Sequence, residues 1–321
     1  MVLLVCLLVF ALCYVLVPPV TALAWRIGAV DVPRDWRRMH PKSIPRAGGL
    51  AIYLSFLIGC IAIGSPSSFL ICTLGGGALL LAVGLADDIF CLGAWTKLLF
   101  QIATATAAVL GSGIVSGRKA FWAVLWVLTL TNAHNFIDGL DGLFAGCAAI
   151  ECGALCLCFV ALGNSADVIP PLLLGGSCLA FRHYNRFPAQ IFAGDCGSGT
   201  VGFLLGMFSL PLFGNFSLRL SLLAPFFVFA YPLTDLFTAV LRRILRGKSP
   251  FAADRGHLHH RICAAGLTQP RCGDVLLLIT AALGGVGVLI STDRFLLAAG
   301  IACLAAAILM MRIRRFIANF A

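Results

Sequence analysis

The chain has 321 residues, of which 60% are hydrophobic and only 11% are charged. Soluble globular domains carry about 25% charged residues, so this composition excludes a soluble enzyme. It also excludes a disordered chain, which would be poor in apolar residues. The charge is lopsided, with 23 Lys and Arg against 13 Asp and Glu. We therefore predict an all-α, polytopic integral membrane protein that forms one domain over residues 1–321.

Apolar runs that are long enough to cross a bilayer recur along the whole chain. A membrane-spanning helix needs about 17–25 mostly apolar residues. The runs are continuously apolar and do not alternate, which argues against transmembrane strands. We therefore expect about eleven transmembrane helices. They cover residues 1–24, 48–64, 67–86, 95–112, 119–137, 142–162, 167–182, 198–214, 218–241, 274–290 and 294–312.

The basic residues predict how these helices are oriented. With the N-terminus outside, 19 of the 23 Lys and Arg side chains fall on the inner side, and only Arg118, Lys119, Arg219 and Arg294 fall outside. By the positive-inside rule this predicts an outer N-terminus and a cytoplasmic C-terminus. The cytoplasmic loops would then be about 25–47, 87–94, 138–141, 183–197 and 242–273.

Most acidic residues gather on the same side as the bases. Asp87 and Asp88 end the third span, Asp138 and Asp141 follow the fifth, and Asp195 precedes the eighth. An electropositive inner surface could simply attract anionic lipids. Acids interspersed among bases indicate a divalent cation together with a polyanionic substrate. A purely structural anchor would not explain this clustering.

A strip of amides and carboxylates ends the fifth span. Asn132, Asn135, Asp138 and Asp141 recur every three residues, so a continuing helix would present them on one face. Such a strip is costly in lipid and is expected to face a protein interior or a wet cavity. The alternative is capping of the following helix, above all by Asp141. We predict a functional role for the strip.

Three other acids are candidates for catalysis or metal binding. Adjacent residues on a helix point about 100° apart, so Asp87 and Asp88 are expected to have different roles, unless they only solvate the end of the span. Asp195 is flanked by glycines, which let the backbone approach a ligand closely. It would cap the following helix or hold a metal ion, and Asp is a hard oxygen ligand suited to Mg²⁺.

Two basic segments are candidates for phosphate binding. The segment 254–261 combines Asp254, Arg255 and Arg261 with three histidines. This segment does not supply four zinc ligands at the standard spacing, so we favour a phosphate site or a solvated loop. The first inner loop, 31–49, is basic and Pro-rich and runs into two glycines at a span start. It is either a membrane-surface loop or a lid over a phosphate-bearing ligand.

Read together and in order, these motifs resemble a known family. It is that of the polyprenyl-phosphate N-acetylhexosamine-1-phosphate transferases, glycosyltransferase family 4. The first loop and the His-x-His-His segment are more similar to the undecaprenyl-phosphate N-acetylglucosaminyl 1-phosphate transferase branch than to phospho-N-acetylmuramoyl-pentapeptide transferase. The resemblance runs from residue 31 to about 262. The matching residues include Arg38, His40, Pro45, Arg46, Gly48, Gly49, Asp87, Asp88, Lys97, Gln101, Asn132, Asn135, Asp138, Asp141, Asn185, Pro188, Gly194, Asp195, Pro232, Asp235, Asp254, Arg255, His257, His259 and His260.

The resemblance implies a reaction at the cytoplasmic face of the bacterial inner membrane. A UDP-sugar would give its sugar 1-phosphate, most simply N-acetylglucosamine 1-phosphate, to undecaprenyl phosphate, and UMP would leave. The product would start a lipid-linked envelope glycan such as lipopolysaccharide or wall teichoic acid. Another UDP-N-acetylhexosamine and UDP-MurNAc-pentapeptide remain open as donors. The implied partners are these substrates, membrane lipid and a second copy of the chain, with no nucleic acid. The implied cofactor is Mg²⁺, with Mn²⁺ as an alternative.

The resemblance also assigns roles to residues. It leaves open whether the sugar phosphate is transferred in one displacement step or in two. Catalytic roles fall to Asp87, Asp88, Asp195, His257 and His259. Substrate-binding roles fall to Arg46, Lys97, Asn132, Asn135, Asp138, Asp141, Asn185, Arg255 and His260. The metal ligands would be Asp195 and Asp88. The alternative function is a secondary transporter, whose ionisable residues lie near the midplane. Only Glu151 lies clearly mid-span, and we interpret it as a hydrogen-bonded residue facing the bundle.

Overall fold

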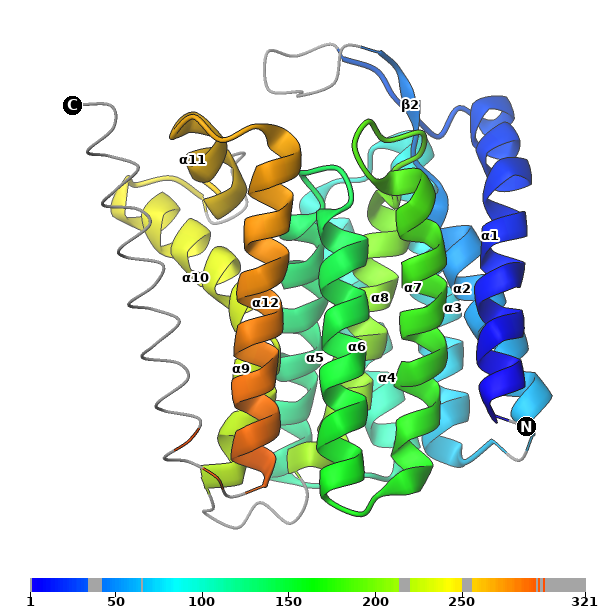
Figure 1. Cartoon of the computed structure of the whole chain (residues 1–321), viewed down its shortest axis with the longest axis vertical. Coiled ribbons are helices and arrows are strands. Elements are labelled where there is room, and N and C mark those ends of the chain that lie inside the picture. Colours follow the sequence, from blue (N-terminus) through cyan, green and yellow to red (C-terminus); the bar gives the residue numbers. More distant parts are fainter. Residues whose placement is uncertain are drawn as a thin grey trace.

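The computed structural model describes residues 2–33, 42–64, 66–213, 220–249 and 256–292, with residues 294 and 297. The predicted last span, 294–312, therefore lies almost wholly outside the described residues. So do Arg38 and His40 of the first loop and Asp254 and Arg255 of the last. Within the described ranges the chain is nearly all helical, as predicted (Figure 1).

The helices form a single up-and-down bundle (Figure 1). Continuous apolar sequence favours helices here because a helix satisfies its backbone hydrogen bonds internally. The helices are α1 (Val2–Ile27), α2 (Gly48–Ile63), α3 (Ser68–Phe90), α4 (Ala94–Ser112), α5 (Arg118–Ile137), α6 (Leu143–Ala161), α7 (Ile169–Asn185), α8 (Gly194–Ser209), α9 (Ala224–Val228), α10 (Ala230–Leu245), α11 (Leu258–Ala264) and α12 (Gln269–Ser291). Short 3-10 turns cover Ser165–Val168, Leu210–Phe213 and Leu220–Leu223.

In the part of the chain that the structure describes, six helices are long and apolar enough to cross a membrane. They are α1, α3, α5, α6, α8 extended to Phe213, and α12. The helices α2 and α7 are shorter, with 16 and 17 residues. A multi-pass membrane protein is therefore confirmed, and the count of eleven spans stays a prediction.

The predicted span 218–241 is broken into pieces. After the 3-10 turn, α9 ends at Val228 and α10 begins at Ala230. Pro225 and Pro232 each lie in a first helical turn, where the missing N–H group costs nothing, since first-turn amides have no acceptor within the helix. The two prolines indicate from the sequence that this span can break, and the structure shows the break at Phe229. The break lets α10 lie tilted to the bundle (Figure 1).

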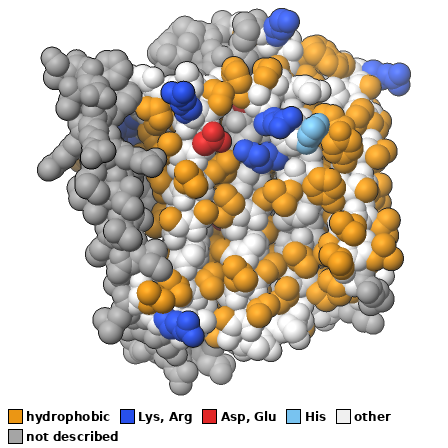
Figure 2. All heavy atoms as spheres, viewed as in Figure 1, with side chains coloured by type: hydrophobic (Ala, Val, Ile, Leu, Met, Phe, Trp, Pro, Cys, Tyr) orange, Lys and Arg blue, Asp and Glu red, His pale blue; other side chains and the backbone are white. Residues whose placement is uncertain are grey.

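The polar loops meet at the end of the bundle opposite the N-terminus, where β2 and α11 lie (Figure 1). Strand β1 (Val30–Asp31) pairs antiparallel with β2 (Ile44–Pro45). Arg46 then forms a parallel bridge with Phe192. Hydrophobic side chains cover the middle of the face in Figure 2, and most of its charged side chains lie toward that same end. This arrangement matches a bilayer around the apolar band.

Glycines bring the start of α8 against α2 and α3. A Cβ atom on Gly49 would lie 2.3 Å from Cα of Gly197, and one on Gly84 would lie 2.5 Å from Cα of Cys196. Only a residue without a side chain allows backbones this close. The first turn of α8, which carries Asp195, is therefore held at the centre of the polar end of the bundle.

Candidate active site

Asp88 holds the N-terminus of α8. Its Oδ1 accepts a hydrogen bond from the Asp195 backbone N–H (3.0 Å), and its Oδ2 accepts one from Cys196 N–H (3.1 Å). The Arg46 guanidinium forms an ion pair with Oδ1 at 3.0 Å. A carboxylate is favoured at this position because the first amides of a helix are unpaired donors with partial positive charge. Asp88 therefore anchors the segment that carries Asp195.

Lys97 lies between two other carboxylates. Its Nζ atom donates to Oδ2 of Asp87 at 2.9 Å and to Oδ2 of Asp195 at 2.7 Å. The three residues come from α3, α4 and α8, so the bundle brings together positions up to 108 residues apart in the chain. The side chains of Lys97 and Asp195 are about 30% exposed, which leaves the cluster open to a ligand.

The asparagine strip on α5 faces this cluster. Nδ2 of Asn135 donates to Oδ1 of Asp195 at 3.1 Å and to Oγ of Ser198 at 3.0 Å. Nδ2 of Asn132 donates to Oε1 of Gln101 at 2.9 Å. As predicted, the two asparagines face the protein interior and not lipid.

A cavity of about 250 Å³ opens beside the cluster. Its lining combines polar side chains with apolar ones, among them Leu80, Val83 and Leu98. The polar lining consists of Lys97, Gln101, Thr131, Asn132, Asn135, Asp195 and Arg243. Such a mixture of apolar surface and a few convergent polar groups is typical of a small-molecule site.

Arg243 also lines this cavity. It is 6% exposed, and its guanidinium lies 5.0 Å from the centre of the Phe136 ring. A stacked, nearly buried guanidinium is well suited to bind phosphate groups. Sequence reasoning counted Arg243 only as an inner-side base. Its position in the last turn of α10, next to a polar loop, held no signal that it points into a cavity.

The Phe136 ring also packs against a histidine. The ring of Phe136 lies 5.3 Å from that of His257, edge to face. Nδ1 of His257 donates to Oδ2 of Asp235 at 2.7 Å, because a carboxylate only accepts. Oδ1 of Asp235 accepts from Leu258 N–H at 2.7 Å. Asp235 thus orients His257, whose Nε2 remains available. Asp235 was noted as a motif residue and not as a site residue.

His259 is buried without a hydrogen-bond partner among the described residues. It is 1% exposed, and neither ring nitrogen is bonded. A Cβ atom on Gly139 would lie 2.7 Å from its Nε2, so the ring packs against the turn after α5. Burial lowers the pKa of His259 to about 3, with His260 adding repulsion. The imidazole is therefore neutral at physiological pH.

The acids of the turn between α5 and α6 differ in role. Burial raises the pKa of Asp138 well above its ordinary value, and the nearby Asp195 and Asp88 raise it further. Oδ2 of Asp141 accepts from Ala189 N–H at 2.9 Å. Asn185 accepts from Gly142 N–H and donates to the Ile191 carbonyl. Asp141 and Asn185 thus hold the 183–193 loop in place, and substrate binding by either stays a prediction.

The remaining predicted residues fall around this centre. Arg46 lies at the Asp88 end, and the His260 ring lies 4.3 Å from that of His259. Arg255 lies outside the described residues. The structure therefore brings most of the predicted site residues to one end of the bundle, from segments that are far apart in the chain.

Comparison with known proteins identifies the family of this chain. The glycosyl transferase family 4 model matches residues 70–213, which include Asp87, Lys97, Asn135 and Asp195. The probable undecaprenyl-phosphate N-acetylglucosaminyl 1-phosphate transferase of Bacillus subtilis (strain 168) is 34% identical over 79% of this chain and 75% of its own length. The chain belongs to glycosyl transferase family 4. The resemblance drawn from the motifs is confirmed.

Two other relatives of this family-4 protein have similar names. The decaprenyl-phosphate N-acetylglucosaminephosphotransferase of Mycobacterium leprae (strain TN) is 35% identical over 81% of this chain and 75% of its own. The undecaprenyl-phosphate alpha-N-acetylglucosaminyl 1-phosphate transferase of Escherichia coli (strain K12) is 27% identical, over 85% and 79%. All three names specify N-acetylglucosamine and a polyprenyl phosphate.

Proposed function

We propose that this protein transfers N-acetylglucosamine 1-phosphate from its UDP derivative to undecaprenyl phosphate, and that UMP is released. The reaction would take place at the cytoplasmic face of the bacterial inner membrane. One observation carries the proposal: a lysine held between two carboxylates, in the wall of a cavity that is lined by both polar and apolar side chains. Such a cavity suits a phosphate joined to a hydrocarbon chain. The names of the relatives supply the sugar.

The chemistry requires two anions to approach each other. An oxygen of the lipid phosphate attacks the β-phosphorus of the donor, and the bond between that phosphorus and the UMP oxygen breaks. Positioning and neutralisation of charge dominate the catalysis of such transfers. Lys97 and Arg243 line the cavity and supply positive charge, and Nε2 of His257 is directed by Asp235. A phosphate monoester is already largely ionised near neutral pH, so a strong general base is not obligatory.

The residues present fit a magnesium ion. Lys97 Nζ shows that a cation is accommodated between the carboxylates of Asp87 and Asp195. Mg²⁺ prefers hard oxygen ligands and often uses only one or two carboxylates together with substrate phosphates. When bound, Mg²⁺ would neutralise the donor diphosphate.

Asp195 is the ligand that we favour for this ion. Its side chain is 28% exposed, whereas that of Asp88 is buried and both Asp88 oxygens already accept backbone hydrogen bonds. The hydrogen bonding of Asp88 supports a role as an anchor of α8. Metal binding by Asp88 stays a prediction that this pattern does not favour.

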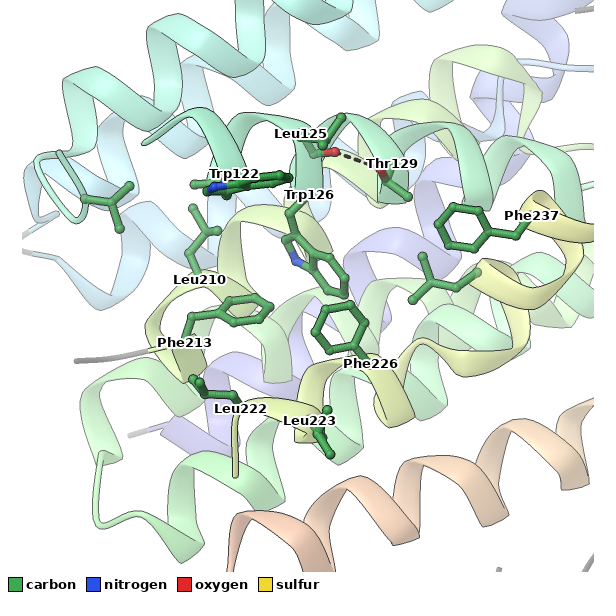
Figure 3. Close-up of a pocket in the computed structure, with 13 residues that line it drawn as sticks. Trp122, Leu125, Trp126, Thr129, Leu210, Phe213, Leu222, Leu223, Phe226 and Phe237 are labelled. Carbon is green, nitrogen blue, oxygen red and sulfur yellow. Dashed lines mark hydrogen bonds between the residues drawn. The ribbon is translucent and has the colours of Figure 1, made fainter. Parts of the chain in front are cut away.

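A second, apolar cavity offers room for the isoprenoid chain. Its volume is about 450 Å³, and aromatic side chains of α5, α9 and α10 surround it, including Trp122, Trp126, Phe226 and Phe237 (Figure 3). It shares two helices with the polar cavity. On α5, Thr129 lines one and Asn132 lines the other, about 4.5 Å apart along the axis. A lipid along α5 would have its phosphate near Asn132.

The direct test uses purified protein, UDP-N-acetylglucosamine, undecaprenyl phosphate and Mg²⁺, with UMP release as the readout. We expect release that depends on the lipid phosphate. A panel of other UDP-amino sugars tests the donor. No release with any donor would overturn the transferase proposal. Transport of a UDP-sugar into proteoliposomes without UMP release would support the transporter instead.

A further inference from the structure

A pair of ionisable residues lies buried in the core of the bundle, and neither residue lines the polar cavity. His134 of α5 and Glu151 of α6 are both 0% exposed, and Nε2 of His134 lies 2.7 Å from Oε2 of Glu151. Ionisable groups are expensive inside a membrane and usually have a function there. Neither group belongs to the reaction described above.

The hydrogen bonds define where the protons of this pair lie. Nδ1 of His134 lies 2.8 Å from the carbonyl oxygen of Leu130. A carbonyl only accepts, so Nδ1 carries a proton. The short contact between Nε2 and Oε2 then holds one further proton, on either atom. In both arrangements the pair has no net charge, which makes it tolerable in a low-dielectric core.

The pair lies next to a residue of the site. His134 precedes Asn135, whose amide bonds to Asp195 and Ser198 of α8. On α8, a Cβ atom at Gly202 would lie 2.6 Å from the Leu130 carbonyl oxygen and 2.9 Å from Cβ of His134. The end of α5 is therefore held on one side by close backbone contact with α8, and on another by the hydrogen bond to α6.

We propose that the His134–Glu151 pair is a positioning device that holds α5 so that Asn135 reaches Asp195. The inference rests on the proposed transferase function. A rotation or slide of α5 by a fraction of a turn would withdraw the Asn135 amide from Asp195 and Ser198. The pair prevents this because it is a short, fully buried hydrogen bond on the same turn. Glu151 acts through Asn135 and does not touch substrate.

Two substitutions of Glu151 separate a hydrogen-bond role from a proton-relay role. In Glu151→Gln the amide can donate to Nε2 of a neutral His134, and its oxygen takes the place of Oε1, which has no partner among the described residues. We expect this variant to retain kcat to within about 2-fold, because the hydrogen bond survives. Glu151→Ala removes it and should lower kcat about 10-fold, since small misplacements at a site are costly.

The closing experiment is a double-mutant cycle with Asn135. If the pair acts through Asn135, Glu151→Ala should lower kcat by less than about 2-fold in an Asn135→Ala background. Ser55→Ala is the matched control, because it removes another buried interhelical hydrogen bond, from Ser55 Oγ of α2 to Ser177 Oγ of α7 (3.0 Å), and neither residue lines either cavity. We expect it to lower thermal stability and to leave kcat per folded protein unchanged.

Three outcomes would overturn the inference while the wild type still releases UMP. They are equal effects of Glu151→Ala in both backgrounds, loss of activity in Glu151→Gln as large as in Glu151→Ala, and an equal loss in the control. Hydrogen exchange provides a readout independent of turnover. Glu151→Ala should speed exchange in peptides 128–137 and 194–200, whereas unchanged exchange contradicts the proposal. Absence of UMP release from the wild type would contradict only the proposed function.

Discussion

At the scale of single residues, the site is built by giving neighbouring carboxylates different partners. Asp87 and Asp195 share Lys97, while Asp88 binds Arg46 and two backbone amides. Adjacent positions on a helix point about 100° apart, which is why Asp87 and Asp88 face different partners. The sequence indicated two roles for this pair, and the structure shows which residue anchors α8.

The first prediction at this scale concerns Asp195. Asp195→Asn keeps the size of the side chain and removes its charge, so Lys97 loses one of its two carboxylates. We expect UMP release to fall about 100-fold, as for other displaced catalytic groups. Steady-state assays with saturating substrates measure this. The control is Asp167→Asn, in the 3-10 turn before α7, which should keep the wild-type rate. An unchanged rate in Asp195→Asn would remove the assigned role.

A second prediction concerns the pH dependence of stability. The pKa of His259 is about 3 in the folded chain and ordinarily about 6.5, so between these values the unfolded state binds the extra proton. The stability that the buried, neutral His259 contributes to the folded state is fully present above pH 6.5. It is lost as the pH falls toward 3. The loss is at most ~1.4 kcal/mol per pH unit.

The measurement compares wild type with His259→Gln, which cannot titrate. Unfolding in detergent at pH 7.5 and pH 5.0 gives the loss of stability on acidification for each protein. We expect the loss to be smaller in the variant. Equal losses would show that His259 is not buried in its neutral form.

At the scale of elements, the start of α8 decides the geometry of the site. The segments 44–49 and 192–195 are joined by backbone hydrogen bonds, among them Phe192 N–H to the Pro45 carbonyl at 2.9 Å and Gly48 N–H to the Phe192 carbonyl at 3.0 Å. This brings Arg46 beside Asp88. The predicted basic loop thus contributes to the site through its last residues, whereas residues 34–41 lie outside the described part of the chain.

The third prediction tests this segment. Gly194 has φ +75°, and a Cβ atom there would lie 2.5 Å from Oδ2 of Asp88. Gly194→Ala should therefore weaken the cap of α8, lower the unfolding free energy by about 1–3 kcal/mol and reduce UMP release. Gly153→Ala is the matched control, because nothing lies within 4 Å of its Cβ position on α6. Similar stability in the two variants would argue against a close-packed start of α8.

At the scale of the whole molecule, one end of the bundle is polar and the sides are apolar. Figure 2 shows hydrophobic side chains over the middle of one face and charged ones mostly near the end that carries α11. A bilayer places the apolar band in hydrocarbon and the polar end at its surface. The excess of basic residues in the loops of that end predicts that it faces the cytoplasm.

The fourth prediction tests this sidedness. Cys91 caps α3 at the polar end and is exposed. A membrane-impermeant maleimide should therefore label it in inside-out membrane vesicles and not in right-side-out ones. The Cys91→Ser variant measures how much label the other cysteines take up. This control is needed because the structure does not describe residues 301–321. Labelling of Cys91 only in right-side-out vesicles would reverse the orientation.

The sequence by itself determined the class of the protein, most helix positions and the residue types of the site. Composition and long apolar runs are local properties, and a bilayer leaves helices as nearly the only solution for such runs. Ordered motifs then identified Asp87, Lys97, Asn135 and Asp195 as candidates. In the 218–241 segment the two prolines indicated that the span can break, and the structure shows where the helix is interrupted.

Only the tertiary structure decided which side chains meet. The pairing of Asp88 with the α8 amides, the stacking of Arg243 on Phe136 and the meeting of His134 with Glu151 each join separate helices. They depend on the rotation and depth of each helix in the bundle. Those are set by packing contacts such as Gly84 against Cys196, which involve distant parts of the chain and leave no periodic signal in the sequence.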